Sequence, residues 1–365
     1  MTILQYRKAL HNVPLYKAGA SSLQSAVKPI KLSSNENAFG ASPAAIEAFK
    51  SCADKLFKYP DGSATDLRRA IAARYHVDEN HIICGAGSDN ILELCALCFL
   101  ENGDEGIIST HTFPLYNIII QIAGGVPVKI PYREDLSHDV DAIIAASNAK
   151  TKIIFIANPD SPTGQYLTKD EILKLVQNVP KHVLIVIDEA YYEFADADDY
   201  TTSLPLVQTY ENVVVTRTFS KMFGLAALRV GWGYLPQIAL DALSRARSPF
   251  NVSMPSQMAA IAALEDIDWQ EKNIADNLSA RQRLDMILKD QNYHFFPSQA
   301  NFILVKFPDA SKADAYFKEH NIIVRHMTGN AMPDYIRISL GTEDQMDALE
   351  KALEKMPEAL KAITT

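Results

Sequence analysis

Four short polar segments each follow an apolar run, and together they carry an amine, a carboxylate and several hydrogen-bond donors. The apolar runs end at Cys84, Ala157, Ile187 and Thr216, and the polar segments that follow are residues 85–90, 158–164, 188–191 and 217–221. Short, nearly continuous apolar runs are typical of parallel strands that are buried on both faces of a sheet. Because the carboxyl ends of parallel strands meet at the ligand-binding edge of such a sheet, we expect the four segments to form one site.

The amine and the carboxylate of this expected site are Lys221 and Asp188. Lys221 precedes the apolar residues 222–225, and an amine that apolar neighbours desolvate has a lowered pKa and becomes a nucleophile. Asp188 ends an apolar run, and Tyr191 follows it closely. Each of these residues alone also fits an ordinary role, on the surface, as a helix cap or in packing, so only their combination indicates chemistry.

Two further features indicate an anion site. Gly85-Ala86-Gly87 precedes an expected helix over residues 88–100, whose first N–H groups are available to a phosphate. Arg229 lies in an otherwise apolar stretch and needs an anionic partner if it is buried. The glycine turn lacks the third glycine of a dinucleotide fingerprint. A nicotinamide dehydrogenase is therefore an alternative, but it leaves the amine and the carboxylate without a role.

These parts match what pyridoxal phosphate requires of a protein. The cofactor needs an amine for its Schiff base, a carboxylate beside the ring nitrogen, donors to the ring hydroxyl and a cradle for its phosphate. The carboxylate keeps the ring nitrogen protonated, and the amine, once released, is a general base near the α-carbon of the substrate. The residues therefore favour a pyridoxal-phosphate enzyme over a protein that only binds a ligand, in which a reactive lysine would have no use.

The sequence predicts an α/β fold with two domains to position these residues. Expected strands at 81–84, 106–109, 152–157, 183–187 and 213–216 alternate with helical patterns that include 66–75, 91–100 and 169–176. Such alternation predicts a mostly parallel sheet that is flanked by helices on both faces. Beyond Pro255, a helical stretch over 258–289 and strand-like runs over 300–307 and 335–340 predict a smaller α+β domain. We expect an N-terminal arm over 1–42 that joins the small domain, a large domain over 43–254 and a small domain over 255–365.

Composition narrows the class of protein. The 365 residues carry a net charge of −9, which argues against nucleic-acid binding because that function needs a basic face. The apolar runs are shorter than the roughly 20 residues of a membrane span, and the first residues lack an apolar signal segment. We therefore expect a cytoplasmic enzyme without nucleic-acid or membrane partners. Cys95 and Cys98 lack the second ligand pair of a zinc site, so we expect two buried helical thiols and no metal.

The chain also resembles the fold-type-I pyridoxal-phosphate aminotransferases of class I/II, and most closely the histidinol-phosphate aminotransferase family, from about residue 16 to residue 342. The motifs that carry the resemblance are Lys31–Asn37 (KLSSNEN), Tyr59–Gly62 (YPDG), Gly87–Asp89 (GSD), Asp188–Tyr191 (DEAY), Thr218–Lys221 (TFSK) with Arg229, and Tyr335–Thr342 (YIRISLGT). Their order is specific, although each motif is short. The resemblance implies the fold-type-I arrangement, a homodimer, and transfer of an amino group between a small-molecule amino donor and an oxo acid.

The resemblance also implies a role for individual residues. Lys221 would form the Schiff base, Asp188 would pair with the ring nitrogen, and Tyr191 would donate to the ring hydroxyl. Phe113 would stack on the ring, and the phosphate would be surrounded by Gly87, Ser88, Asp89, Thr218, Ser220 and Arg229, with Tyr59 reaching it from the neighbouring subunit. The substrate would be lined by Tyr16, Asn37, Asn301 and Arg325, with Arg337 as the anchor of its anionic group. Guanidinium groups suit an anion anchor because they bind carboxylates and phosphates bidentately.

A few positions depart from the family pattern. Ser161 stands where the family has an asparagine that donates to the ring hydroxyl, and a shorter hydroxyl predicts a weaker or water-mediated contact. Asn90 and residues 38–40 also differ from the usual residues. The cofactor prediction survives these changes, but the substrate is less determined. We expect histidinol phosphate with glutamate or 2-oxoglutarate, in histidine biosynthesis. An aromatic amino acid is the alternative donor, and decarboxylation of a phosphorylated amino acid is a further alternative reaction.

Overall fold

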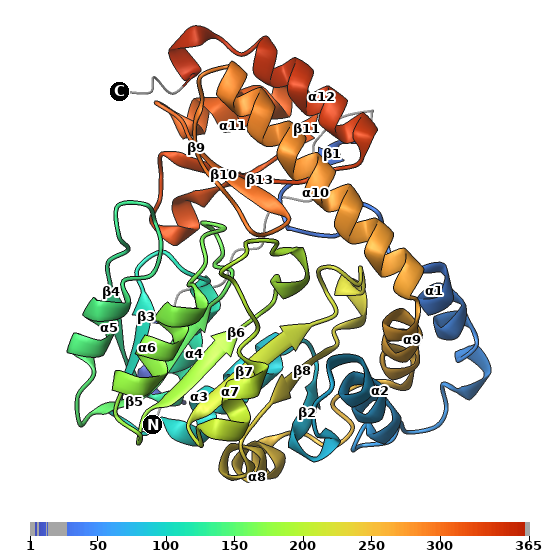
Figure 1. Ribbon diagram of the computed structural model, residues 1–365, viewed down its shortest axis with the longest axis vertical. Coiled ribbons are helices and arrows are strands. Elements are labelled where there is room, and N and C mark those ends of the chain that lie inside the picture. Colours follow the sequence, from blue (N-terminus) through green and yellow to red (C-terminus); the bar gives the residue numbers. More distant parts are fainter. Residues whose placement is uncertain (1–3, 6, 12, 14–27, 362–365) are drawn as a thin grey trace.

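The computed structural model describes residues 4–5, 7–11, 13 and 28–361. A seven-stranded sheet with its helices forms the larger part, and a four-stranded sheet with its own helices lies beyond one edge of it (Figure 1). The expected α/β class is confirmed. Within the described ranges, no helix has the length and apolar character needed to cross a membrane.

The seven-stranded sheet has the order β2-β8-β7-β6-β5-β3-β4. Its strands are β2 (Ile82–Gly85), β3 (Glu105–Ser109), β4 (Val126–Ile130), β5 (Thr151–Ala157), β6 (Leu184–Asp188), β7 (Val213–Thr218) and β8 (Gly231–Tyr234). β8 runs antiparallel to both of its neighbours, β2 and β7, and the five strands from β7 to β4 pair in parallel. The five strands expected from the sequence are confirmed, whereas β4 and β8 were not predicted.

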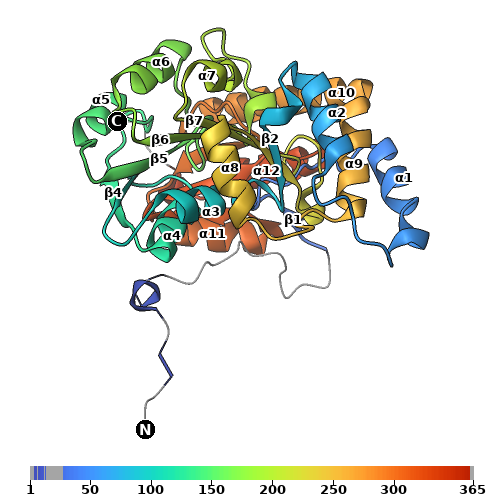
Figure 2. The ribbon, with the colours of Figure 1, turned by 90° about the horizontal axis from the view of Figure 1, so that it is seen from below.

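Apart from the edge strand β4, the strands of this sheet are buried on both faces, which explains their continuous apolar runs. In β6, Ile185 and Ile187 join one core, and Leu184 and Val186 join another on the opposite face. The first core is covered by α2 (Thr65–Tyr75), α5 (Val140–Ala146), α6 (Lys169–Asn178) and α7 (Leu204–Thr209), and the second by α3 (Ser88–Phe99), α4 (Pro114–Ala123) and α8 (Gln237–Ala246). Figure 2 shows the two groups of helices on opposite sides of the strands.

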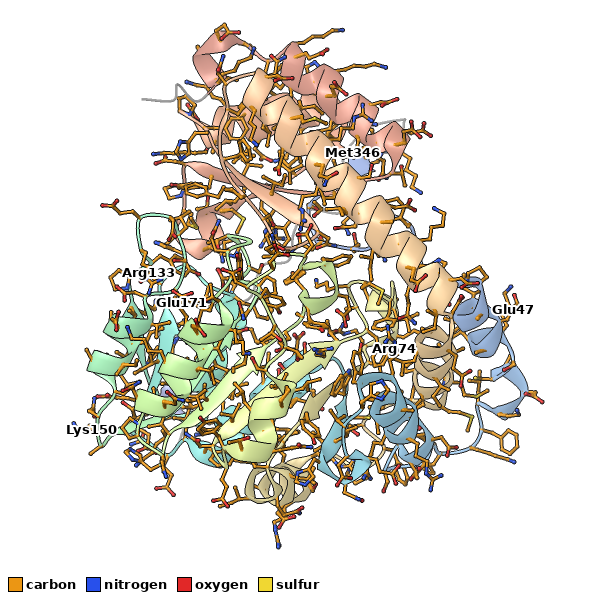
Figure 3. All side chains as sticks on the ribbon, in the orientation of Figure 1. Glu47, Arg74, Arg133, Lys150, Glu171 and Met346 are labelled. Carbon is orange, nitrogen blue, oxygen red and sulfur yellow. The ribbon has the colours of Figure 1, made fainter. Side chains whose placement is uncertain are left out.

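Helix α6 illustrates how the local sequence sets where a helix begins. The side chain of Thr168 accepts a hydrogen bond from the backbone N–H of Glu171, and the Glu171 carboxylate accepts one from the backbone N–H of Thr168. This capping box satisfies N–H groups that have no partner within the helix. The same carboxylate forms an ion pair of 2.6 Å with Arg133, whose side chain lies beside it in Figure 3. The start of α6 is thereby tied to the segment that follows β4.

The smaller part is an antiparallel sheet with the order β12-β13-β10-β9. Its elements are β9 (His294–Phe296), β10 (Phe302–Lys306), β12 (Arg325–His326), β13 (Tyr335–Ser339), α10 (Ile267–Asp290), α11 (Ala310–Glu319) and α12 (Glu343–Glu354). Nearby, β1 (Ile30–Lys31) pairs in parallel with β11 (Ile322–Ile323). Leu284, Phe317 and Ile338 belong to a separate apolar core in this part. The N-terminal segment therefore joins the smaller part at β1.

The helical stretch expected over 258–289 is two helices, α9 (Met254–Glu265) and α10. The break lies at Asp266, whose carboxylate caps α10 by accepting from the backbone N–H of Trp269. Ala259 of α9 belongs to the core under the seven-stranded sheet, and α9 packs against α1 (Pro43–Lys50) and α2. The change from one core to the other therefore falls within α10. The division of the chain at residues 254 and 255 stays a prediction.

Candidate active site

A cavity of about 240 Å³ lies where the two sheets face each other. All four polar segments contribute to its lining, from the carboxyl ends of β5, β6 and β7 and from the start of α3. Arg325 of β12 and Arg337 of β13 line it from the smaller part. The convergence expected from the sequence is therefore present, and the cavity combines an amine, a buried carboxylate and three guanidinium groups.

Asp188, the last residue of β6, is the buried acid of the cavity. It accepts hydrogen bonds from the Tyr116 hydroxyl at 2.8 Å and from the Thr216 hydroxyl at 3.1 Å. Burial raises the pKa of Asp188 from 3.8 to about 6, although the two hydroxyl donors and Lys221 act in the opposite direction. A carboxylate that is desolvated in this way is stabilised strongly by a cationic group beside it, such as a protonated ring nitrogen.

Lys221 and Tyr191 lie on the same wall of the cavity. Lys221 is half-buried in the segment after β7, and its Nζ atom is 5.5 Å from the centre of the Tyr191 ring. The preceding residue, Ser220, is buried. Tyr191 is also buried, and its hydroxyl accepts a hydrogen bond from the Asn35 side chain at 2.9 Å. An amine and a phenol are therefore held together a short way along the sheet edge from Asp188.

The other end of the cavity has the features of an anion cradle. Ser88 begins α3, so the first N–H groups of that helix are available to a ligand. Arg229 donates to Asp89 at 3.1 Å and to Ser220 at 3.3 Å. Gly87 has a φ of +82°, and a Cβ atom there would lie 2.5 Å from the Arg229 guanidinium. Only glycine leaves room for the guanidinium to lie against the turn.

The smaller part of the molecule contributes Arg325 and Arg337 to the cavity. Arg337 donates to the Ser161 hydroxyl at 3.1 Å and to the backbone carbonyl of Ser33 at 3.1 Å. Its guanidinium lies 5.2 Å from the centre of the Phe302 ring. These contacts with a hydroxyl, a backbone carbonyl and an aromatic face hold the guanidinium in place at the cavity.

The segment that presents Ser161 is anchored by the fully buried Asp160. This carboxylate accepts hydrogen bonds from Thr112 at 2.7 Å, from Tyr132 at 2.7 Å and from Thr163 at 3.0 Å. Three hydroxyl donors compensate for the burial of the charge. The position of Ser161 is therefore set by a network that the sequence analysis did not identify.

The structure brings most of the predicted site residues together. The cavity is lined by Ser88, Asp89, Phe113, Ser161, Asp188, Tyr191, Thr218, Ser220, Lys221, Arg229, Arg325 and Arg337, and Gly87 lies directly behind it. Asn37 and Asn301 do not line it: Asn37 donates to the carbonyl of Met222 and to Asn273, and Asn301 donates to the carbonyl of Asn35. Tyr59 is 81 % exposed and stacks on Phe250 at 4.7 Å. Tyr16 lies outside the described residues.

Several residues at the cavity were missed from the sequence. Tyr116 and Thr216 hold Asp188, and Asn35 holds Tyr191. Asn330 also lines the cavity and donates to the carbonyls of His111 and Thr112. A signal existed for Asn35, which lies in the motif Lys31–Asn37, and for Tyr116, which follows three residues after Phe113. The sequence carried no comparable signal for Asn330.

The predicted thiols are in α3, where Cys95 is buried and Cys98 is half-buried. Burial raises the pKa of the Cys95 thiol, so the group is unreactive. Over residues 28–361 and the short N-terminal pieces that the structure describes, no group of three or more His, Cys, Asp or Glu side chains is placed to hold a metal ion.

The fold and the site place the chain in a known family. Residues 27–353 match the model of aminotransferase class I and II, and the chain belongs to that family.

Several similar proteins within this family share one name. The chain is 41 % identical over 342 residues to a histidinol-phosphate aminotransferase of Rhodospirillum centenum, with 93 % of this chain and 94 % of that protein covered. It is 40 % identical to a protein of the same name from Paramagnetospirillum magneticum, with 97 % and 99 % covered. Among solved structures, the histidinol-phosphate aminotransferase of Sinorhizobium meliloti in complex with pyridoxal-5′-phosphate superposes with a TM-score of 0.89 at 29 % identity, with 96 % and 97 % covered. The resemblance identified from the motifs is thereby confirmed.

Proposed function

We propose that this protein is a pyridoxal-phosphate-dependent aminotransferase that moves an amino group between histidinol phosphate and 2-oxoglutarate, in histidine biosynthesis. The observation that carries the proposal is the meeting of Lys221, Asp188 and Tyr191 with an anion cradle in one cavity. Relatives about 40 % identical over nearly the whole chain bear the name of this enzyme, which supports the choice of substrate.

The residues of the cavity fit the cofactor. A buried acid with a raised pKa suits a protonated ring nitrogen, and the Gly87 turn at the start of α3 suits a phosphate. Asp188 would pair with the ring nitrogen, Ser88, Ser220 and Arg229 would hold the phosphate, and Lys221 would bind the cofactor covalently. When bound, the cofactor supplies a ring that accepts negative charge from the α-carbon of the substrate.

The protein's own groups then have separate tasks. Arg337 and Arg325 would bind the anionic groups of donor and acceptor, which a rigid guanidinium fork can do for a phosphate ester and for a carboxylate. Once the amino donor has displaced the Lys221 amine, this amine would act as the general base that takes the proton from the α-carbon of the donor and holds it on Nζ. Ser161 and Tyr191 are buried residues that line the cavity, and their hydroxyls would donate hydrogen bonds to the bound ring.

We further propose that the protein works as a homodimer in the cytoplasm, with Tyr59 reaching the phosphate site of the partner. The segment around Tyr59 exposes three large apolar side chains, those of Leu56, Phe57 and Tyr59, beside the partly exposed Phe250. A contiguous exposed apolar group of this kind is typical of an interface between subunits. Light scattering of the purified protein tests the dimer, and Tyr59→Phe should weaken binding of the cofactor phosphate.

The test of the function is a comparison of donors. The protein, saturated with pyridoxal phosphate, is mixed with 2-oxoglutarate and with histidinol phosphate, phenylalanine or tyrosine, and glutamate formation is measured. Histidinol phosphate should give the highest kcat/KM, and Lys221→Ala should remove turnover with each donor while leaving the folded state intact.

The same assay separates the alternatives. A clear preference for phenylalanine would refute the proposed substrate and leave the aminotransferase class standing. Release of CO₂ without a requirement for an oxo acid would instead indicate a decarboxylase.

A further inference from the structure

Asn35 occupies an unusual position beside the active site. It is 1 % exposed and has a φ of +53°, a conformation that asparagine adopts more readily than most residues. Its backbone is fixed from two sides, because its N–H donates to the Ser339 hydroxyl at 2.9 Å and its carbonyl accepts from Asn301 at 3.1 Å. A residue with a positive φ whose backbone is held on two sides next to a cavity indicates a task there.

The orientation of the Asn35 amide follows from the hydrogen-bond inventory. The Ser339 hydroxyl accepts from the Asn35 backbone N–H, and it donates its single proton to the Asn35 Oδ1 atom at 3.0 Å. Because Oδ1 faces Ser339, the Nδ2 atom faces Tyr191 and donates to its hydroxyl at 2.9 Å. The direction of the Asn35–Tyr191 hydrogen bond is thus set by Ser339.

This direction determines what Tyr191 can do. A tyrosine hydroxyl has one proton to donate, and here its oxygen already accepts from Asn35. Among the residues that the structure describes, no acceptor takes the Tyr191 proton. The hydroxyl belongs to a side chain that lines the cavity beside Lys221. The proton is therefore available to an acceptor inside the cavity.

Ser161, the other expected donor to the cofactor ring hydroxyl, is less constrained. Its hydroxyl accepts from Arg337 at 3.1 Å and is therefore coupled to the guanidinium expected to bind the substrate. The Tyr191 hydroxyl accepts instead from the Asn35 amide, whose orientation Ser339 sets. Of the two hydroxyls, Tyr191 is the donor whose direction the protein fixes in advance.

We propose that Asn35, held by Ser339, is a positioning residue that obliges Tyr191 to donate its proton to the ring hydroxyl oxygen of the cofactor. The proposal rests on the proposed function. A donor at this oxygen withdraws electron density from it, and so lowers the basicity of the conjugated nitrogen that joins the cofactor to Lys221. Loss of the donor raises the pH at which that nitrogen loses its proton.

The experiment measures this pH in the substrate-free holoenzyme from the absorbance of the bound cofactor. Tyr191→Phe should raise the midpoint by about one pH unit, the usual size of a hydrogen bond to a charged group. Asn35→Asp should raise it at least as far, because a carboxylate accepts the Tyr191 proton and adds negative charge. Ser339→Ala frees the amide to turn and should give a smaller rise without any change of charge.

A double-mutant cycle separates positioning from a general structural effect. In the Tyr191→Phe background, Ser339→Ala should add no further shift, because the group through which it acts is gone. Asn212→Asp is the matched control, because the Asn212 amide also donates a hydrogen bond, in its case to the backbone carbonyl of Val183 at the other end of the strands from Tyr191. The midpoint of this variant should equal that of the wild type.

Two results would overturn the inference: an Asn35→Asp holoenzyme with the wild-type midpoint, or a Ser339→Ala shift of the same size with and without the Tyr191 hydroxyl. If Asn35→Asp does not fold, the Ser339→Ala cycle, which removes only one hydroxyl, decides the question. A wild-type protein that binds no pyridoxal phosphate covalently would contradict the proposed function instead, so the two failures are distinguishable.

Discussion

Replacing the buried acid by its neutral isostere, Asp188→Asn, is expected to make the cofactor-free protein more stable and to weaken cofactor binding. The side chain keeps its shape, and the amide still forms hydrogen bonds with Tyr116 and Thr216 once the Thr216 hydroxyl turns to accept. The substitution therefore removes the charge and little else. A site that destabilises the free protein in order to bind a cation is a recognised trade-off between stability and function.

The magnitude follows from the raised pKa of Asp188. A rise from 3.8 to about 6 corresponds to about 3 kcal/mol, at about 1.4 kcal/mol per unit. The sign follows from linkage: an acid with a raised pKa in the folded state binds protons more tightly when folded, so the native state loses stability as the pH rises from about 4 to about 6. The advantage of Asp188→Asn should therefore be about 1.5 kcal/mol at pH 5 and about 3 kcal/mol at pH 8.

Urea unfolding of the cofactor-free proteins at pH 5 and pH 8 measures this difference. Asp54→Asn, which removes an exposed carboxyl, controls for the loss of a charge. The difference between wild type and Asp188→Asn should grow with pH, and the variant should need much more pyridoxal phosphate for saturation. A wild-type protein that is the more stable of the two at pH 8, or a difference independent of pH, would refute the reasoning.

Three further substitutions test the anion cradle, a buried ion pair and the anion anchor. Gly87→Ala would place a Cβ atom 2.5 Å from the Arg229 guanidinium at a φ of +82°. The affinity for pyridoxal phosphate, measured by equilibrium dialysis, should therefore fall by about tenfold or more. An unchanged affinity would count against the cradle. The Glu189 carboxylate accepts two hydrogen bonds from the buried Arg217 guanidinium, at 2.7 Å and 3.0 Å. Glu189→Gln removes this negative charge and should lower the free energy of unfolding, measured by urea titration, by about 3–5 kcal/mol. A loss below about 1 kcal/mol would contradict this expectation. Arg337→Lys replaces the planar guanidinium, which can bind an anion through two N–H groups, by a single ammonium group. KM for donor and acceptor should rise by about tenfold, whereas the absorbance of the bound cofactor should stay the same. An unchanged KM would place the anion anchor elsewhere.

The parts of the fold predicted from the sequence are those with the strongest local signal. Parallel strands such as β6 are apolar on both faces and stand out from the chain. The missed strand β8 contains Gly231 and Gly233, which lack β propensity, and a Cβ atom at Gly231 would lie 2.4 Å from the Ser88 backbone nitrogen. Its glycines are set by tertiary packing against the start of α3. β4, with Pro127 on the sheet edge, lacked a signal for the same kind of reason.

The sequence predicted the residues that are expected to touch the ligand. It did not predict the residues that support them through contacts within the protein. Lys221, Asp188 and Arg337 have side-chain types that only a few chemistries require. Tyr116 of α4 supports Asp188 at the end of β6, and Asn330 reaches the cavity from the smaller part. Their roles depend on distances that the sequence does not contain. Asn37 lay in a recognised motif, but its amide binds Asn273 of α10 and not the cavity.

The central claim is that Lys221 binds pyridoxal phosphate covalently. Borohydride reduction of the holoenzyme fixes such a bond, and mass spectrometry of the digested protein then locates it. We expect one cofactor-derived modification per chain, on the peptide that contains Lys221, and none in Lys221→Ala. A modification on another lysine, or an unmodified protein after reduction, would contradict it.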